Sequence, residues 1–219
     1  MKVILFGATG MVGQSVLAEC LKSVIIEEIL IIGRRSCDIK NPKINEIIHT
    51  DFLDFSVIEN KFKAYDACFY CLGVSSVGIS KEKYYDITYN YTEAVAEALS
   101  RQNPNMSFAF ISGAGTDETE KSSANWARVK GKAENVLKEY GFKSLSLFRP
   151  AYIKAMDGVK PSYSISKYLD WFLYPVLKTF FPKIVITSKE LGLAMINSIF
   201  QKEKVKVLEN SDIKKLAYH

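Results

Sequence analysis

Three glycines near the start of the chain have the spacing of a dinucleotide-binding turn. Gly7, Gly10 and Gly13 follow the short apolar run 3–6 and open a stretch with helical periodicity. In such a strand–turn–helix unit, the first glycine allows a sharp turn, the second lets a pyrophosphate approach the backbone, and the third lets the helix pack closely on the sheet. The N–H groups at the helix start then face the phosphates. The spacing predicts a dinucleotide site, although a tight turn without a ligand gives the same pattern.

A pair of arginines bears on which dinucleotide binds. Arg34 and Arg35 follow the apolar run 25–32 and Gly33, where the second strand is expected to end. An acidic residue near this point binds the ribose hydroxyls in NAD sites, whereas arginine accommodates the 2′-phosphate of NADP. Guanidinium groups also pair well with a phosphate dianion, so the sequence predicts NADP in preference to NAD. An exposed, solvated turn is the alternative interpretation.

Residues after the next two predicted strands extend this site. Asp51 follows the expected strand 45–50, where it can bind the adenine amino group or serve only as a turn residue. The small-residue loop 73–78 follows the expected strand 67–72, where the sugar and nicotinamide lie in a doubly wound sheet. The predicted cofactor contacts are Gly7, Thr9, Gly10, Met11, Val12, Gly13, Arg34, Arg35, Asp51, Phe52, Leu72, Gly73, Lys130, Pro150 and Ile153.

The elements that position these residues alternate between strand and helix, which predicts an α/β fold with a Rossmann-type, doubly wound parallel sheet. With 219 residues, 48% of them hydrophobic, we expect one domain over 1–219. Residues 154–204 are expected to form a small helical appendage on the substrate side or at an interface. The expected strands are 3–6, 25–32, 45–50, 67–72, 108–111, 144–148, 184–186 and 205–208, and the helices 11–22, 81–101, 126–140, 166–181, 188–200 and 212–216.

The expected helix 166–181 carries more aromatic and aliphatic side chains than one buried stripe can hold. A lid over an apolar substrate, a dimer face and a membrane-surface patch are its three interpretations. Charges at Lys167, Asp170 and Lys178 and the interrupting Pro175 argue against a membrane span. We therefore predict a small-molecule substrate, a homodimer or partner contact through 166–181, and no stable membrane insertion.

Charge and cysteine content exclude other classes of function. The net charge of +5 comes with scattered lysines, so no nucleic-acid groove is predicted. The first apolar run ends at Gly7 and is too short for a signal peptide, so a cytoplasmic location is expected. Cys68 and Cys71 match C-x-x-C, but residues three apart on a strand point to opposite faces. No metal site and no disulfide are predicted.

Several further motifs follow the glycine turn and the arginine pair in order. They are Asp51, Cys71-Leu72-Gly73, Val129-Lys130-Gly131, Phe148-Arg149-Pro150 and Leu208-Glu209-Asn210. Together they resemble the short-chain dehydrogenase/reductase superfamily, in its atypical or extended branch, over nearly the whole chain. They look most like the Tat-interacting-protein, or metastasis-suppressor, type of NADPH-binding oxidoreductase and like bacterial nucleoside-diphosphate-sugar epimerase-like proteins.

The resemblance implies catalysis by a Tyr-x-x-x-Lys pair helped by a serine, in which the lysine lowers the tyrosine pKa and holds the ribose. Lys130 matches the lysine, whereas Trp126 stands at the tyrosine position and its indole cannot act as a titrating acid. The family hydroxyl commonly falls one residue after Ser112, where this chain has Gly113. The candidate catalytic residues are Lys130, Ser112 and Trp126, and the candidate substitute acids are Tyr84, Tyr85, Tyr89, Tyr152, Asp117 and Glu118.

Two functions from different classes follow. The first is an NADP-dependent oxidoreductase or epimerase-like enzyme acting on a carbonyl or hydroxyl group, favoured by the glycine motif, the arginine pair and Lys130. The second is an NADP(H)-binding sensor or interaction protein that kept the fold and lost the chemistry, favoured by Trp126 and Gly113. The enzyme is preferred because the residues of the cofactor cleft are all present.

Overall fold

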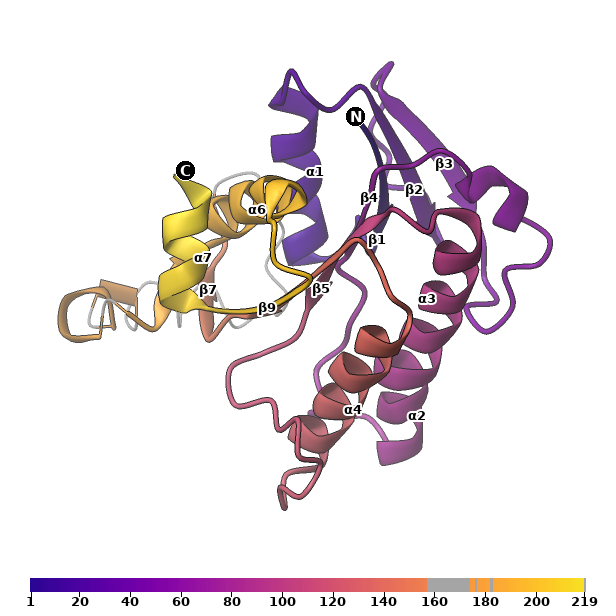
Figure 1. The fold of residues 1–219 in the computed structure, drawn as a ribbon. Helices are drawn as coiled ribbons and strands as arrows, with labels where there is room; N and C mark the ends of the chain where they lie inside the picture. The colour runs from indigo at the N-terminus through magenta and orange to yellow at the C-terminus, as the bar shows by residue number, and fades with distance from the viewer. Residues whose placement is uncertain (157–173, 176, 182, 219) are drawn as a thin grey trace.

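A central parallel sheet organises the molecule. The computed structural model describes residues 1–156, 174–175, 177–181 and 183–218. Seven strands pair in the order β3-β2-β1-β4-β5-β6-β9, and every neighbouring pair runs parallel (Figure 1). The strand order reverses between β1 and β4, which creates the crevice where doubly wound sheets bind ligands. The predicted fold class is confirmed.

The helices and strands have the following bounds. The sheet contains β1 (Lys2–Phe6), β2 (Glu28–Gly33), β3 (Ile44–Ile48), β4 (Ala67–Tyr70), β5 (Ser107–Ile111), β6 (Ser144–Arg149) and β9 (Val205–Glu209), and β7 (Tyr152–Lys154) pairs separately with β8 (Val185–Thr187). The helices are α1 (Met11–Lys22), α2 (Lys81–Tyr85), α3 (Tyr91–Gln102), α4 (Asn125–Glu139), α6 (Ser188–Asn197) and α7 (Asn210–Ala217). Short segments are η1 (Glu59–Phe62), the π-helical η2 (Asp86–Asn90) that joins α2 to α3, and η3 (Ser198–Phe200).

Two apolar cores lie on opposite faces of the sheet. Along β1, Leu5 belongs to a core shared with α1, α6 and α7, whereas Phe6 belongs to a core shared with α3 and α4. Figure 1 shows these two groups of helices on opposite sides of the sheet. This alternation is the strand period of two. It also separates Cys68 from Cys71, which contact different cores and are free thiols. The predicted opposite orientation of the two cysteines is confirmed.

Several predicted boundaries shift, and the largest corrections concern β2 and the helix expected over 81–101. The strand predicted over 25–32 begins at Glu28, because the Met1 amine binds the Ile25 carbonyl at 2.6 Å and the Met1 carbonyl accepts from the Glu27 N–H at 2.9 Å. These bonds turn the chain before β2 can start. The helix predicted over 81–101 is interrupted by the wider turn of η2, so that three segments replace one.

Part of the predicted appendage belongs to the main body. Leu191 and Met195 of α6 are fully buried in the core that α1 also fills. Gly192 lies so close to α1 that an added Cβ would be 3.0 Å from the Ser15 carbonyl oxygen. Helical spacing predicted α6 correctly as a helix, but its partner α1 lies too far along the chain for the pattern to reveal. Most of the expected helix 166–181 lies outside the described residues.

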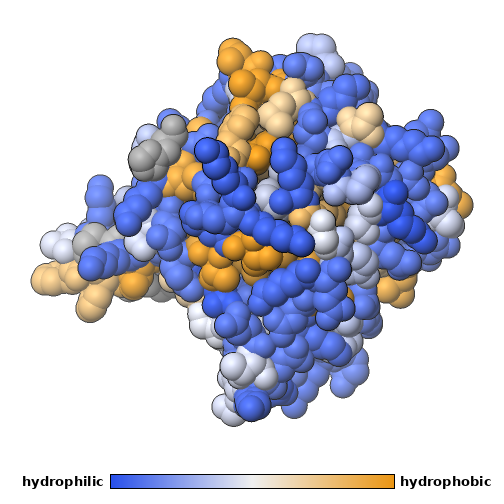
Figure 2. Space-filling view, viewed as in Figure 1, coloured by the Kyte–Doolittle hydropathy of each residue, from blue (hydrophilic) through white to orange (hydrophobic). Residues whose placement is uncertain are grey.

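The described end of that expected helix has exposed aromatic side chains. Figure 2 shows hydrophobic residues gathered on the arm that carries residues 177–181, whereas hydrophilic residues cover most of the main body on this face. Phe180 and Phe181 are 72% and 57% exposed. Among the described residues, no helix combines the length and the apolar character that crossing a bilayer demands. A protein contact through 166–181 therefore stays a prediction.

Candidate functional site

The glycine turn between β1 and α1 has a geometry that only glycine allows at two positions. Gly7 has a φ of +80°, and an added Cβ there would lie 2.6 Å from the Cys71 carbonyl oxygen. An added Cβ at Gly13 would lie 2.0 Å from the Gly7 carbonyl oxygen, so α1 packs directly on the turn. Gly10 caps α1 without a side-chain acceptor, which leaves the first N–H groups of the helix available to an anion.

A cavity of about 430 Å³ opens beside this turn. The glycine turn lines one side of it, and Arg34 and Arg35 after β2 line the other. The structure thus brings together two groups of predicted residues that are separated in the sequence by α1 and β2. The complete lining is Gly7, Ala8, Thr9, Ile31, Gly33, Arg34, Arg35, Phe52 and Leu72.

A smaller pocket continues the cavity toward α3. Arg34, Phe52 and Leu72 line both spaces, and Gly73, Val74, Ile87 and Tyr91 complete the smaller one. The rings of Phe52 and Tyr91 lie 5.6 Å apart between centroids and are tilted by 35°. The sequence prediction missed Tyr91, since it comes from a distant helix and carries no local signal. The prediction also omitted Gly33 from the cofactor contacts. Its position at the end of the expected strand, directly before the arginine pair, was the signal that could have identified it.

Other predicted cofactor contacts lie outside the cavity lining. The carboxylate of exposed Asp51 accepts a hydrogen bond from the Leu53 N–H at 3.0 Å, which is the turn role that the sequence left open. Val12 and Ile153 pack against the core. Gly10, Met11 and Gly13 belong to the turn and to the start of α1, and Pro150 is buried just after β6.

Lys130 lies on the second turn of α4 and belongs to the lining of neither pocket. Its Nζ is 3.5 Å from the Ile111 carbonyl oxygen at the end of β5 and 5.9 Å from the centroid of the Phe110 ring. Burial lowers the pKa of Lys130 to about 8, against the opposing effect of the Glu134 carboxylate. Gly113 faces the same side chain, because an added Cβ there would lie 3.9 Å from Cδ and Cε of Lys130.

The Ser112 hydroxyl has a structural partner. Thr116 Oγ1 donates to the Gly113 carbonyl at 2.8 Å, and Ser112 Oγ lies 2.9 Å from Thr116 Oγ1. Because a threonine hydroxyl has one hydrogen, Ser112 must be the donor to Thr116. The proton of Ser112 is therefore used to hold the loop after β5.

Trp126 packs against the loop after β5, and most of the candidate substitute acids are buried or hydrogen-bonded. The Trp126 ring lies 3.3 Å from the position of an added Cβ at Gly115, whose φ is +84°. Tyr84 is buried, with 2% of its surface exposed. The other candidates have these places: Tyr85 accepts from Lys132, Tyr89 donates to Glu93, Tyr152 lies in β7, and Asp117 accepts four hydrogen bonds from its own loop.

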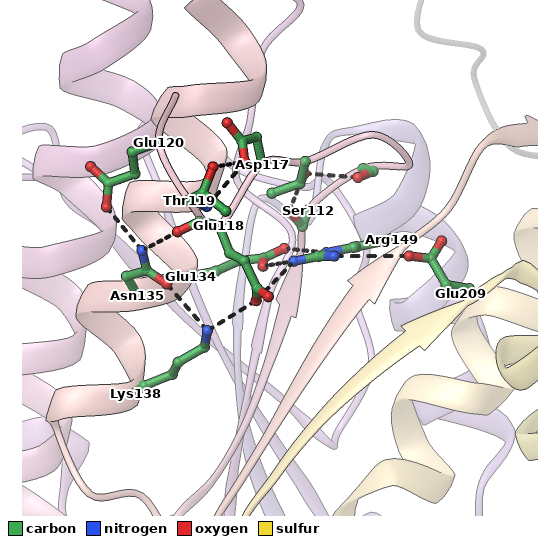
Figure 3. A network of polar contacts seen from close by, with 12 residues as sticks. Ser112, Asp117, Glu118, Thr119, Glu120, Glu134, Asn135, Lys138, Arg149 and Glu209 are labelled. Atoms are coloured by element: carbon green, nitrogen blue, oxygen red, sulfur yellow. Dashed lines mark hydrogen bonds and ion pairs between the residues drawn. The ribbon is translucent and has the colours of Figure 1, made fainter. Parts of the chain in front are cut away.

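A charged network fixes the elements around Lys130. Arg149 at the end of β6 donates through Nε to Glu134 of α4 at 3.0 Å, and a second guanidinium nitrogen binds the other carboxylate oxygen (Figure 3). Glu134 is fully buried. Glu118 of the loop and Glu209 of β9 approach the same guanidinium at 3.7 and 4.0 Å. One arginine thus ties the loop after β5, α4, β6 and β9 together.

Residues 3–128 match the model of the NAD dependent epimerase/dehydratase family, which covers more than half of the chain. The chain belongs to this family. Its similarity to family proteins confirms the resemblance to the extended dehydrogenase/reductase branch that the motifs indicated. The family is defined by dependence on a nicotinamide dinucleotide, which agrees with a glycine turn that opens onto a cavity.

Named relatives extend this assignment. The chain is 27% identical over 154 residues to Protein HTATIP2 of Rattus norvegicus, spanning 69% of this chain and 62% of the rat protein. It is 29% identical over 156 residues to Protein FMP52-2, mitochondrial, of Scheffersomyces stipitis, spanning 68% of this chain and 65% of that protein. Both alignments thus cover less than two thirds of the relative's length.

A solved structure shows the same fold. MoeE5 in complex with UDP-glucuronic acid and NAD superposes with a TM-score of 0.73 at 13% identity, covering 95% of this chain and 75% of MoeE5. Identity this low establishes the fold alone, so the ligands of MoeE5 say nothing of the substrate here. Because the yeast relative carries a mitochondrial name, the expected cytoplasmic location also stays a prediction.

Proposed function

We propose that the protein is an NADP-dependent oxidoreductase or epimerase-like enzyme that acts on a carbonyl or hydroxyl group of a small molecule. The observation that carries the proposal is a cavity whose lining contains both the start of the glycine turn and the arginine pair. A phosphorylated dinucleotide needs backbone N–H groups for its pyrophosphate and a cation for its 2′-phosphate. This cavity offers both.

The chain's own residues divide the work of binding. The turn 7–13 takes the pyrophosphate, Arg34 and Arg35 take the 2′-phosphate, and Phe52 with Leu72 and Tyr91 encloses the adenine. The bound cofactor supplies hydride transfer. Lys130 of α4, whose Nζ lies 3.5 Å from the Ile111 carbonyl oxygen where β5 ends, holds the ribose. Gly73 lines the smaller pocket, and no heavy atom lies within 4 Å of an added Cβ there, so this position is open to the cofactor.

Isothermal titration calorimetry with NADP⁺ and NAD⁺ tests this proposal. Each charge-assisted bond contributes about 1.5–3 kcal/mol, so Arg34→Ala and Arg35→Ala should each weaken NADP⁺ binding about 10- to 100-fold. Binding of NAD⁺, which lacks the phosphate, should change little. Lys63→Ala, an exposed cation outside the cavity lining, is the matched control. Equal losses for both dinucleotides, or no heat with either, would contradict the proposal.

A sensor or interaction protein is the second candidate. It is favoured by Trp126, which packs on the loop at Gly115, and by Ser112, whose proton is committed to Thr116. Under this function, cofactor binding changes affinity for a partner, and a homodimer or partner contact through 166–181 is part of the proposal. Pull-downs with and without NADPH, compared with NADPH oxidation by a carbonyl panel, separate the two functions. Turnover together with cofactor-independent pull-downs would exclude the sensor.

A further inference from the structure

The edge of the sheet around Lys130 poses a chemical problem. Reduction of a carbonyl needs a proton for the oxygen that becomes a hydroxyl. The indole of Trp126 cannot titrate as an acid, and the hydrogen of Ser112 is used within the loop. Tyr89 donates its hydroxyl proton to Glu93, and Tyr85 accepts from Lys132. The indole and the hydroxyl at the family positions are therefore not free to supply the proton, and the nearby cation is the next group to consider.

The amine of Lys130 has the required position and capacity. An ammonium has three donors, and the hydrogen bond from Nζ to the Ile111 carbonyl is long at 3.5 Å. The side chain is only partly exposed, and it lies where β5 ends, at the edge where doubly wound sheets bind ligands. Gly113 brings no side chain against its Cδ and Cε, since an added Cβ there would lie 3.9 Å from both atoms.

We propose that Lys130 is itself the general acid and base of the reaction, in place of the family tyrosine. In the reducing direction, the carbonyl carbon gains a hydride from a reduced nicotinamide dinucleotide, and an N–H bond of Lys130 breaks to place its proton on the carbonyl oxygen. An alcohol, the oxidised dinucleotide and a neutral amine result. The amine then takes up one proton from the solvent, so that the reduction consumes one solvent proton overall, and the reverse reaction uses the neutral amine as base. This role rests on the proposed function.

The charged surroundings of Lys130 suit that role. Burial disfavours the ammonium, and the carboxylate of Glu134, one turn later on α4, favours it, which leaves the pKa at about 8. Glu134 is shared with Arg149 of β6, and Glu118 of the loop after β5 also approaches that arginine. Asp117 turns its carboxylate to its own loop. A general acid works best with a pKa near the working pH.

The test measures the amine directly. NMR titration of the protein with isotope-labelled lysine, assigned with Lys130→Arg, should give a midpoint near 8 for Lys130. In Glu134→Gln the midpoint should fall, because an anion that stabilises the ammonium is lost. Oxidation of NADPH by 4-nitrobenzaldehyde, acetophenone and cyclohexanone should follow the same midpoint and move with it.

Lys130→Arg separates proton transfer from simple charge. Arginine keeps the cation and its donors but does not release a proton in this pH range. We expect NADP⁺ binding by calorimetry to remain within about threefold and turnover to fall about 10²- to 10⁴-fold, the size of a lost general acid. A variant that retains turnover, a Lys130 midpoint above 10, a rate profile unmoved by Glu134→Gln, or no turnover of the panel despite NADP⁺ binding would each overturn the role. Failure of NADP⁺ binding would instead overturn the proposed function.

Discussion

Two regions of the molecule are built differently: the region that lines the cavity, called the cofactor end, and the region around Lys130, called the Lys130 end. At the cofactor end, backbone groups of the glycine turn and two exposed arginines line the cavity. At the Lys130 end, side chains from the loop after β5, α4, β6 and β9 hold one another through Arg149. The shape of the cofactor end depends on glycines that lack side chains, whereas the Lys130 end depends on contacts between charged side chains. Mutations should therefore separate cofactor binding from the integrity of the catalytic edge.

Arg149→Met should have the largest effect on stability. It leaves the fully buried Glu134 carboxylate without its bidentate partner, and breaking a buried pair costs about 3–5 kcal/mol. Arg101→Met is the matched control, since Arg101 is 59% exposed beside Glu59 and exposed pairs contribute about 0–1 kcal/mol. Urea unfolding measures both. Equal losses would show that burial of the network matters less than its geometry suggests.

A pair of glycine substitutions compares the cofactor end with the Lys130 end at a similar loss in the free energy of unfolding. At Gly13, an added Cβ would lie 2.0 Å from the Gly7 carbonyl oxygen. At Gly131, an added Cβ would clash with the Asp117 carbonyl oxygen. Gly13→Ala and Gly131→Ala should each lower the free energy of unfolding by about 1–3 kcal/mol. Only Gly13→Ala should abolish NADP⁺ binding in calorimetry, whereas Gly131→Ala should lower turnover.

Gly73→Ala serves as the control for stability in that comparison. No heavy atom lies within 4 Å of an added Cβ at this position, so its free energy of unfolding should match the wild type. If Gly131→Ala impaired cofactor binding as much as Gly13→Ala did, the cofactor end and the Lys130 end would not be independent.

Lys130→Met should increase the free energy of unfolding. This is the smallest of the changes in stability predicted for the two regions. The folded pKa of about 8 lies below the ordinary 10.5, so the unfolded chain binds more protons between these values. The destabilising effect of the ammonium is complete below pH 8 and disappears as the pH rises toward 10.5. We expect a gain of about 1–2 kcal/mol in the free energy of unfolding at pH 7, since partial exposure reduces the full value. Unfolding curves at pH 7 and pH 10 that show no such gain, or an equal one, would contradict this.

The same contrast explains what the sequence could predict. The turn 7–13 and the element α1 follow from local spacing, because glycine requirements are set by the backbone of neighbouring residues. The pairing of Arg149 with Glu134 joins β6 to α4 across 15 positions, and no periodicity encodes it. Tyr91 lines the smaller pocket from the first position of α3, directly after η2. Long-range side-chain contacts depend on the assembled fold.

The packing of α6 on α1 means that the homology boundary and the folding boundary differ. The family match ends at residue 128, yet α6 and α7 come from residues 188–217 and fill the core against β1 and α1. A fragment cut at the end of the match would expose that apolar face to water and lose β6 and β9 from the sheet. Anyone shortening the chain for expression or grafting should keep the last strand and both late helices together with the glycine turn.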